Sequence, residues 1–425
     1  MKSIFEQFFS GRGMGINPLM EGLEVPVKAK PLMENAFPGA EQLVGTIDDL
    51  PTAEEVGKVS PVEEASIDDA NVQDVDFPSI VKSKTKNDNI AQGIADVRGG
   101  KEKPPVVTDP KTGKPMQSAE RPQRLIHSSA LLKVLTPEGT EIDQEKLRQM
   151  ISVRPKTIIA QNSKLAASGS TTNEIFYDLT LPAYQGLFYN EKAGKFQIVR
   201  TCPSAGACKS YCYASSGAYL QYEGPWLSQA RMINYLMNDY DSFKNQTLSE
   251  LQNVEKSANK KGKKVVLRWH DSGDMVSPTY LQMAYDIARA TPNIKHYAYT
   301  KQVDLVKKFS DQKPENFILN YSKGGTSDKN VDFTKEKHSK VIPYALFKDL
   351  KVEAGVPMSP EDITTLKDRL VKVYSLDPGK LLTYDELMNT PVGTAGGGFN
   401  VIVKPKNGDD AAAREDVTGT LLLIH

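Results

Sequence analysis

The three cysteines of the chain have the spacing that most clearly indicates chemistry. Cys202, Cys208 and Cys212 lie within eleven residues, and no other cysteine occurs among the 425 residues. Randomly scattered cysteines would cluster this tightly about two times in a thousand. Thiolates brought together by the sequence are typical metal ligands, so the cluster predicts a single metal site.

Three kinds of cysteine site have different requirements. A disulfide would leave one thiol over and is uncommon in a reducing compartment. Structural zinc needs four ligands, so a histidine such as His270, His296 or His425 would have to complete the set. A [4Fe–4S] cluster held by three thiolates leaves one iron open for a substrate or cofactor. We expect the cluster, with zinc as the alternative.

A second polar segment, His270 to Asp274, follows a strand predicted for 265–269. It would therefore lie at the carboxyl end of that strand, on the same edge of the sheet as the cysteine loop. Glycine there lets the backbone approach a ligand, and carboxylates can bind an amine or a metal. The same residues are also ordinary turn formers. Their position beside the cysteines favours function, and we predict catalytic roles for His270 and Asp271.

Polar residues also end the next two predicted strands. Tyr299 and Lys301 close one of them, and Asn320 to Lys323 close the other. Each lysine by itself is typical of a solvated surface, but consecutive strands ending in polar residues indicate the rim of a pocket. Tyr299 and Lys301 are therefore candidates to face a substrate. By strand alternation, Arg268 should share a face with His270 and be buried beside an aspartate.

The elements that must position these residues alternate between strand and helix. Strands are predicted at 175–181, 196–200, 265–270, 295–300, 317–322, 341–347, 399–403 and 420–424, and helices at 225–240, 243–258, 277–290, 304–309, 361–373 and 384–388. Repeated strand–helix units predict an α/β fold whose parallel sheet is open or partly closed as a partial (βα) barrel.

The first 125 residues have a different composition. Residues 46–78 carry ten acidic residues and one lysine, and 87–124 are rich in Lys, Gly and Pro without a helical or strand period. Such sequence cannot bury enough apolar surface to offset its ordering entropy. We predict a disordered linker arm over 1–125, with a short helix at its start and a protein partner as one possible role, and an α/β metal-binding domain over 126–425.

The overall charge excludes some partners. The chain has 53 basic and 53 acidic residues, so it lacks the global basic field that is a signature of nucleic-acid binding. No apolar run approaches the roughly 18 residues of a membrane span. We expect no membrane partner and a reducing compartment.

The motifs resemble the phage "gene product eighty-eight" family over about residues 170–425. The resemblance is carried by Thr-Cys-Pro-Ser-Ala-Gly-Ala-Cys-Lys-Ser-Tyr-Cys-Tyr-Ala, Arg-Trp-His-Asp-Ser-Gly-Asp and Tyr-Ala-Tyr-Thr-Lys. It implies a phage protein located in the host cytoplasm or the virion, and it implies no activity.

The chain also resembles radical S-adenosylmethionine enzymes more loosely. Those enzymes hold a [4Fe–4S] cluster on three cysteines at the edge of a partial (βα) barrel, with an aromatic residue before the third, where this chain has Tyr211. The resemblance implies that Ser272, Gly273 and Asp274 bind the amino acid end of S-adenosylmethionine. The cysteine spacing of five and three residues is wider than in that family.

Two hypotheses of function follow. In the first, the chain is a phage-encoded iron–sulfur protein, in its furthest form a radical S-adenosylmethionine-like enzyme that modifies an unknown substrate. In the second, it is a non-catalytic phage protein, virion-associated or host-directed, whose metal site is structural and whose N-terminal arm binds a partner. A hydrolase using His270, Asp271 and Asp274 is a weaker third.

Overall fold

The structure is a computed structural model, and it divides the chain into two compact units. One contains residues 1–64 and 349–363, and the larger contains residues 65–348 and 364–425. The structure describes residues 67–78, 80, 125–161, 165–166, 173–206, 208, 212, 214, 219, 222–342, 346–347, 349–350, 358–393, 396–403 and 409–423. The elements described below lie in the larger unit, except that α11 begins in the smaller one.

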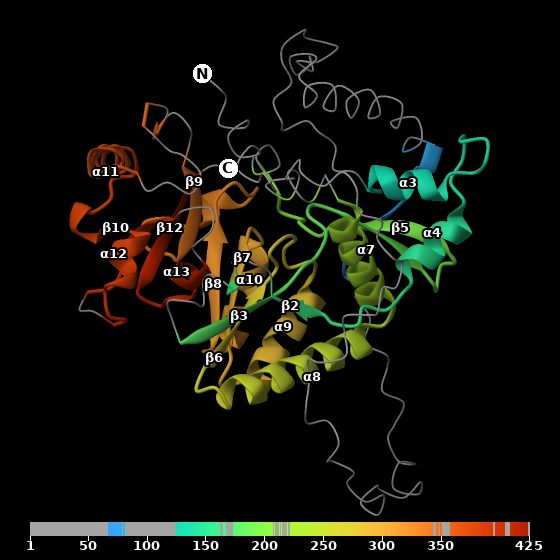
Figure 1. The fold of residues 1–425 in the computed structure, drawn as a ribbon, viewed down its shortest axis with the longest axis horizontal. Helices are drawn as coiled ribbons and strands as arrows, with labels where there is room; N and C mark the ends of the chain where they lie inside the picture. Colours follow the sequence, from blue (N-terminus) through green and yellow to red (C-terminus); the bar gives the residue numbers. More distant parts are fainter. Residues whose placement is uncertain are drawn as a thin grey trace, which may run out of the picture. The chain divides into compact units, whose positions relative to one another are not determined.

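A nine-stranded sheet forms the centre of the larger unit (Figure 1). Its spatial order is β10 (Leu381–Thr383), β11 (Phe399–Val403), β12 (Val417–Leu423), β9 (His338–Ile342), β8 (Phe317–Ser322), β7 (Lys295–Thr300), β6 (Lys264–Trp269), β3 (Glu174–Leu179) and β2 (Ile159–Ala160). All neighbouring strands in this order are parallel except β2, which pairs antiparallel with β3. Among the described residues the sheet is open, with β2 and β10 at its edges.

The direction of winding decides which face each helix covers. From β3 to β9 the parallel strands are added in one direction, and from β10 to β12 they are added back toward β9. Right-handed crossovers therefore place the two sets of helices on opposite faces. The first face packs on α7 (Glu223–Asn238), α8 (Tyr240–Asn259), α9 (Pro278–Ala290) and α10 (Val303–Lys308). The second packs on α12 (Tyr384–Met388) and α13 (Asp409–Ala413).

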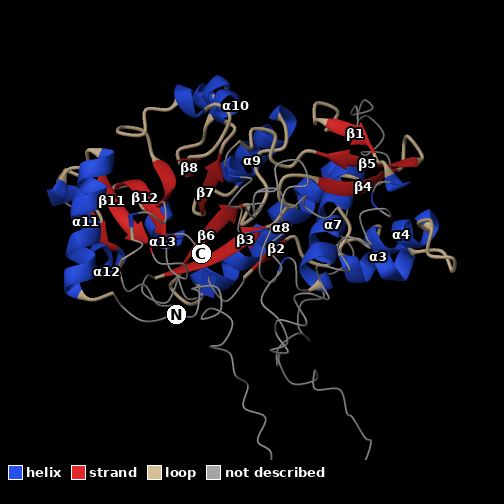
Figure 2. Cartoon of the chain, turned by 90° about the horizontal axis from the view of Figure 1, so that it is seen from above, coloured by secondary structure: helices blue, strands red, loops and turns tan. Residues whose placement is uncertain are grey.

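A small antiparallel sheet combines β4 (Gly186–Asn190) and β5 (Lys195–Val199), which lie between β3 and β6 in the chain, with the earlier strand β1 (Val72–Asp74). Its spatial order is β1, β5, β4, and Figure 2 shows it apart from the main sheet. Residues of this sheet pack with α3 (Ser128–Val134), α4 (Gln144–Ile151) and α7 in a second apolar cluster. The other helices among the described residues are α11 (Pro360–Tyr374) and the short 3-10 turns Ser310–Gln312, Asp328–Asn330 and Pro378–Lys380.

Local sequence explains the elements beside the site. The run Lys264–Trp269 is buried from its second residue onward, as expected for a central parallel strand covered on both faces. Helix α9 is capped at its N-terminus by Ser277, whose side chain accepts a hydrogen bond from the Tyr280 N–H, and its first residue is Pro278. These signals fix the loop between β6 and α9 at both ends.

The predicted α/β fold with a large parallel sheet is confirmed, and its form here is the open sheet. Strand β9 begins three residues earlier than predicted, and the strand predicted at 196–200 belongs to the small antiparallel sheet. Residues 67–78, predicted as part of a disordered arm, contribute β1 and bury Ile67 in the main core. Strand β1 has only three residues, and its partner β5 lies more than 120 residues further along the chain, so the acidic composition of the segment outweighed its weak strand pattern.

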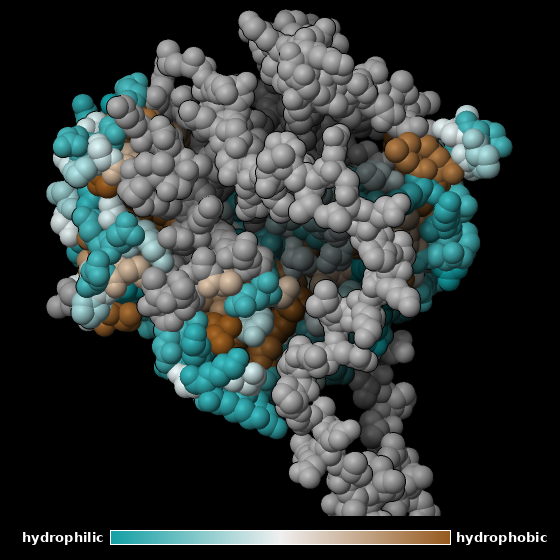
Figure 3. Space-filling view, in the orientation of Figure 1, coloured by the Kyte–Doolittle hydropathy of each residue, from teal (hydrophilic) through white to brown (hydrophobic). Residues whose placement is uncertain are grey.

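Within the described part of the chain, none of the helices has the length and apolar character that crossing a bilayer requires. The longest of them, α8, illustrates this, because its C-terminal end carries the exposed residues Lys256, Asn259 and Lys260. That end lies at the lower edge of the described surface in Figure 3 and is coloured hydrophilic.

Candidate functional site

The cysteine loop is pinned by backbone hydrogen bonds at two places. The N–H groups of Thr201 and Cys202 both donate to the Tyr184 carbonyl, at 3.0 and 3.2 Å. The N–H groups of Gly206 and Cys208 both donate to the Gly324 carbonyl, at 3.1 Å each. A Cβ at Gly206 would lie 2.9 Å from that same carbonyl oxygen, so a side chain there would push the loop away.

The loop reaches the carboxyl edge of the parallel sheet by a different route from the one predicted. It follows β5, which is not a strand of that sheet, yet it docks where β6, β7 and β8 end. The Asp274 N–H donates to the Thr201 carbonyl at 2.8 Å, and the Ser204 hydroxyl donates to the Gln302 side chain at 2.7 Å. The cysteine loop therefore lies beside the loops after β6 and β7 because of tertiary contacts, and the order of the strands alone would not place it there.

The thiols share one electrostatic neighbourhood. Burial raises the pKa of Cys202 strongly, and the charge of Asp274 raises it further. Burial also raises the pKa of Cys208, while the positive charge of Lys301 opposes the increase. The charge of Cys212 acts on both thiols. Buried thiols in such surroundings need a positive partner before they become thiolates, and a bound metal supplies one.

Backbone N–H groups already face two of the sulfurs. The Tyr184 N–H donates to Cys202 Sγ at 3.2 Å, and the Gly206 N–H lowers the pKa of Cys208 through a hydrogen bond. Across the described ranges, no three His, Cys, Asp or Glu side chains are grouped closely enough to hold one metal ion. Tyr211 and His425, both predicted at or near the site, lie outside the described residues.

Both carboxylate oxygens of Asp274 accept hydrogen bonds from other groups of the protein. One carboxylate oxygen accepts from the Met275 N–H and the Thr300 hydroxyl, both at 2.7 Å, and the other accepts from the Lys301 N–H at 2.8 Å. The side chain is buried, and burial raises the pKa of its carboxyl although these hydrogen bonds oppose the increase. Asp274 thus ties the loop after β6 to the end of β7.

Ser272 and Gly273 hold the same loop against the end of β3. The Ser272 hydroxyl donates to the Leu181 carbonyl at 2.5 Å and accepts from the Gln229 side chain at 2.9 Å. Gly273 has a φ of +90°, and a Cβ there would lie 2.8 Å from the Leu181 Cβ. Both residues are explained by packing, as is Asp274, so the geometry gives the predicted S-adenosylmethionine contact no separate support.

His270 lies on the face of the sheet that is covered by α9, which corrects the prediction that it shares a face with Arg268. Its φ of +67° breaks the strand alternation and turns the ring toward α9. Ring atom Nε2 lies 2.8 Å from the Tyr280 hydroxyl, and the buried Nδ1 has no hydrogen-bond partner among the described residues. Burial, assisted by the charge of Arg268, lowers the pKa of His270 to about 3.

Arg268 and Tyr299 form a stacked pair beside this loop. The guanidinium carbon of Arg268 lies 5.2 Å from the centroid of the Tyr299 ring. The guanidinium also donates to the main-chain carbonyls of His270 and Asp271, at 3.2 and 3.4 Å. The predicted aspartate partner of Arg268 is therefore Asp271, but the hydrogen bond goes to its main-chain carbonyl and not to its carboxylate. The structure brings Tyr299 to the site as a stacking partner.

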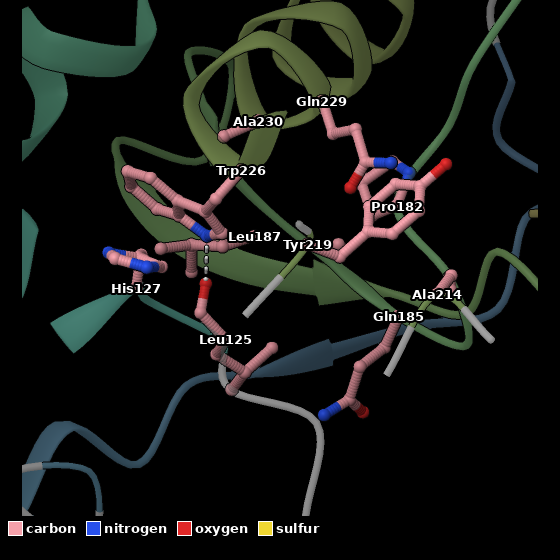
Figure 4. Close-up of a pocket in the computed structure, with 12 residues that line it drawn as sticks. Leu125, His127, Pro182, Gln185, Leu187, Ala214, Tyr219, Trp226, Gln229 and Ala230 are labelled. Atoms are coloured by element: carbon pink, nitrogen blue, oxygen red, sulfur yellow. Dashed lines mark hydrogen bonds between the residues drawn. The ribbon is translucent and has the colours of Figure 1, made fainter. Parts of the chain in front are cut away.

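The carboxylate of Asp271 has one oxygen that could still accept a hydrogen bond. One oxygen accepts a 2.9 Å hydrogen bond from the Tyr219 hydroxyl, whereas the other is buried without a hydrogen-bond partner in the described part of the chain. Tyr219 also lines a small pocket of about 50 Å³, together with Pro182, Trp226 and Gln229 (Figure 4). Tyr219 was not predicted, because nothing in the sequence relates it to Asp271.

Lys301 joins the thiols to the rim of the sheet. Its ammonium donates to the Ser322 hydroxyl at 2.6 Å, and its charge lowers the pKa values of Cys202 and Cys208. The predicted rim residue is therefore a neighbour of the cysteines. In contrast, His296 is excluded as a ligand in this arrangement, because its two ring nitrogens already bond Trp269 and Thr291.

These features define an α/β protein with a polar, cysteine-containing site at the carboxyl edge of an open parallel sheet. A family model described as gene product 88 matches residues 155–376, a little more than half of the chain. The chain therefore belongs to the gene product 88 family, a phage protein family, as the motifs predicted. Neither the curated proteins nor the solved structures gave a match, and the resemblance to radical S-adenosylmethionine enzymes is not supported by these comparisons.

Proposed function

We propose that this phage protein binds an iron–sulfur cluster, of the [4Fe–4S] type, through Cys202, Cys208 and Cys212. One observation carries the proposal: the only three cysteines of the chain lie within eleven residues, and hydrogen bonds fasten the loop that carries Cys202 and Cys208 to the carboxyl edge of the parallel sheet. Thiolates of a cluster bind different irons, so the proposal does not require the sulfurs to converge on one ion.

The chemistry of the donor set supports a cluster. Burial opposes ionisation of the thiols, and an iron–sulfur core offsets that cost by supplying positive charge to the thiolates. Hydrogen bonds to sulfur tune such clusters, and the Tyr184 N–H already donates to Cys202 Sγ. Lys301 adds a positive charge that stabilises ionised cysteines.

The surrounding residues would complete a reactive site. A cluster with three protein thiolates supplies an open iron and one-electron chemistry. Asp271 would accept a proton or a hydrogen bond from a substrate, because one of its oxygens is buried without a described partner. Lys301 would attract anionic groups to the same edge, and His270 would act only after its ring became accessible. The substrate is not identified.

Anaerobic reconstitution with iron and sulfide tests the proposal. We expect a broad absorbance near about 400 nm that is lost in Cys202→Ser, Cys208→Ser and Cys212→Ser. Ser204→Ala is the matched control, because it removes a hydroxyl from the same loop without removing a thiol. A protein that takes up stoichiometric zinc and no iron would overturn the cluster in favour of zinc.

The finer hypothesis of radical S-adenosylmethionine chemistry needs its own assay. The reconstituted and chemically reduced protein would be incubated with S-adenosylmethionine, and 5′-deoxyadenosine would be measured. Product formation that depends on the three cysteines would establish the enzyme. A stable cluster without cleavage would support the alternative of a structural metal site in a virion-associated or host-directed protein.

A further inference from the structure

The loop after β8 holds the middle of the cysteine loop. The Gly324 carbonyl accepts hydrogen bonds from the N–H groups of Gly206 and Cys208, at 3.1 Å each. In the other direction, the Thr326 N–H donates to the Ser204 carbonyl at 3.0 Å. Backbone hydrogen bonds therefore join the two loops in both directions, and the position of the Cys208 backbone depends on the Gly324 carbonyl.

Asp328 fixes the conformation of the loop after β8. One of its carboxylate oxygens accepts from the Gly324 N–H at 2.8 Å, and the other accepts from the Gly325 N–H at 2.9 Å. Gly324 is buried and has a φ of +108°, which residues other than glycine rarely adopt. Because hydrogen bonds to a carboxylate are stronger than those between neutral groups, Asp328 stabilises the turn that directs the Gly324 carbonyl toward the cysteine loop.

Close packing leaves the two loops little room to move. A Cβ at Gly325 would lie 3.0 Å from the Lys301 Cβ and 3.3 Å from the Ser204 carbonyl oxygen. A Cβ at Gly206 would lie 3.0 Å from the Gly325 carbonyl carbon. Glycine on both sides lets the backbones touch, so a displacement of Gly325 would also displace the cysteine loop.

Helix α10 anchors the residues on either side of Asp328. Asp304, in the first turn of α10, accepts from the Ser327 hydroxyl at 2.5 Å and from the Asn330 side-chain amide at 2.6 Å. The Lys307 ammonium, on the same helix, donates to the Asn330 carbonyl at 2.6 Å. An element outside the cysteine loop therefore determines where the Asp328 carboxylate lies.

We propose that Asp328 is a positioning residue of the cysteine site, which sets the location of Cys208 through the backbone of Gly324. Cys202 has a separate anchor, because its N–H donates to the Tyr184 carbonyl, and we expect it to be independent of Asp328. The further consequence, a firmer hold on a cluster, rests on the proposed function. Groups that orient metal ligands typically contribute about ten- to a hundredfold to metal affinity.

Alkylation of the full chain without metal tests the positioning by itself. Iodoacetamide labels each cysteine at a rate that depends on its exposure and ionisation, and tandem mass spectrometry separates Cys208 from Cys202. We expect Asp328→Ala to raise the rate at Cys208 by about threefold or more. The rate at Cys202 should stay at the wild-type value, which also shows that the variant is folded. Asp328→Asn, which keeps one acceptor oxygen, should have a smaller effect.

Asp332→Ala is the matched control. Asp332 is an exposed aspartate in the same connection between β8 and β9, and it accepts from the N–H and the hydroxyl of Thr334, at 3.0 and 2.6 Å. We expect wild-type labelling of both cysteines in this variant. An unchanged ratio of the Cys208 and Cys202 rates in Asp328→Ala, or an equal change in Asp332→Ala, would overturn the proposal.

Chelator challenge of the reconstituted protein tests the consequence for the cluster. We expect Asp328→Ala to lose its absorbance near about 400 nm about tenfold faster than the wild type, and Asp332→Ala to match the wild type. Equal rates in Asp328→Ala and the wild type would overturn the role of Asp328 in holding the cluster. If no form takes up iron while the labelling difference is present, the proposed cluster is contradicted and the positioning of Cys208 is supported.

Discussion

The two halves of the segment His270–Asp274 differ in how their polar atoms are used. In Ser272 and Asp274, the side-chain oxygens bond neighbouring backbone and side-chain groups, which fastens the loop to β3 and β7. In His270 and Asp271, one buried polar atom each has no partner among the described residues. Adjacent residues of one motif therefore serve different purposes. The first half leaves two buried polar atoms without a described partner, and the second half provides rigidity.

The largest expected effect comes from the rigid half. Asp274→Ala removes three hydrogen bonds and leaves two N–H groups and a hydroxyl without their acceptor. We expect the free energy of unfolding to fall by about 3–5 kcal/mol, measured by urea denaturation. Asp271→Ala should cost clearly less. Equal losses in the two variants would contradict the division of the segment.

Gly273→Ala should have the next largest effect. The substitution combines a φ of +90° with a Cβ only 2.8 Å from that of Leu181, and we expect a loss of about 2–4 kcal/mol. The control is Gly262→Ala, at a φ of +64° with open space around it, which should cost only about 1–2 kcal/mol. Thermal denaturation of both variants would show whether the Leu181 contact matters.

Two buried histidines, His270 and His296, should make the stability of the protein depend on pH. Burial lowers the pKa values of His270 and His296 to about 3 each, so the unfolded chain protonates first as the pH falls below about 6.5. Stability is therefore full above that pH and is lost toward pH 3, by at most about 1.4 kcal/mol per pH unit for each histidine. His270→Gln and His296→Gln should each reduce this slope in denaturation measured across pH 4–7.

At pH 7 the same two variants should differ. His296 bonds Trp269 and Thr291 through its two ring nitrogens, whereas His270 bonds Tyr280 through one. We therefore expect His296→Gln to lose about 1 kcal/mol more than His270→Gln. A larger loss in His270→Gln would indicate that its second nitrogen has a partner in the folded protein.

The smallest expected effect concerns Asp271. Tyr219→Phe removes the hydrogen bond to one carboxylate oxygen and should cost about 1 kcal/mol of stability. If Asp271 contacts a ligand, this variant should change ligand affinity more than it changes cluster content. Iron analysis beside a stability measurement checks both. Loss of the cluster in Tyr219→Phe would instead indicate that Asp271 helps to position the cysteine loop.

The sequence predicted much of the main sheet because its strands are rich in aliphatic, β-branched and aromatic residues and alternate with helix patterns. Strands β7 and β8 and the cap Ser277 follow directly from such patterns. The short strands β1, β2 and β10 and the location of β5 depend on tertiary pairing, which has no local signal. The strands β10, β11 and β12 are also added in the reverse direction along the sheet, and the hydrophobic periodicity of the sequence does not predict this reversal of strand order.

The site was predictable only in part for the same reason. Residue types and spacing brought attention to the cysteines, Asp271 and Lys301, and the structure places them at one edge. The turn at His270 depends on a positive φ in a residue other than glycine, which sequence does not indicate. Tyr184 and Tyr219 act through contacts between distant segments.

The iron, sulfide and zinc content of the anaerobically purified protein tests the central claim most directly. A [4Fe–4S] cluster on Cys202, Cys208 and Cys212 predicts about four iron and four sulfide per chain, with an EPR signal after reduction. All of these should be lost when any one of the three cysteines is replaced by serine. One zinc per chain without sulfide, or unchanged iron in the cysteine variants, would contradict it.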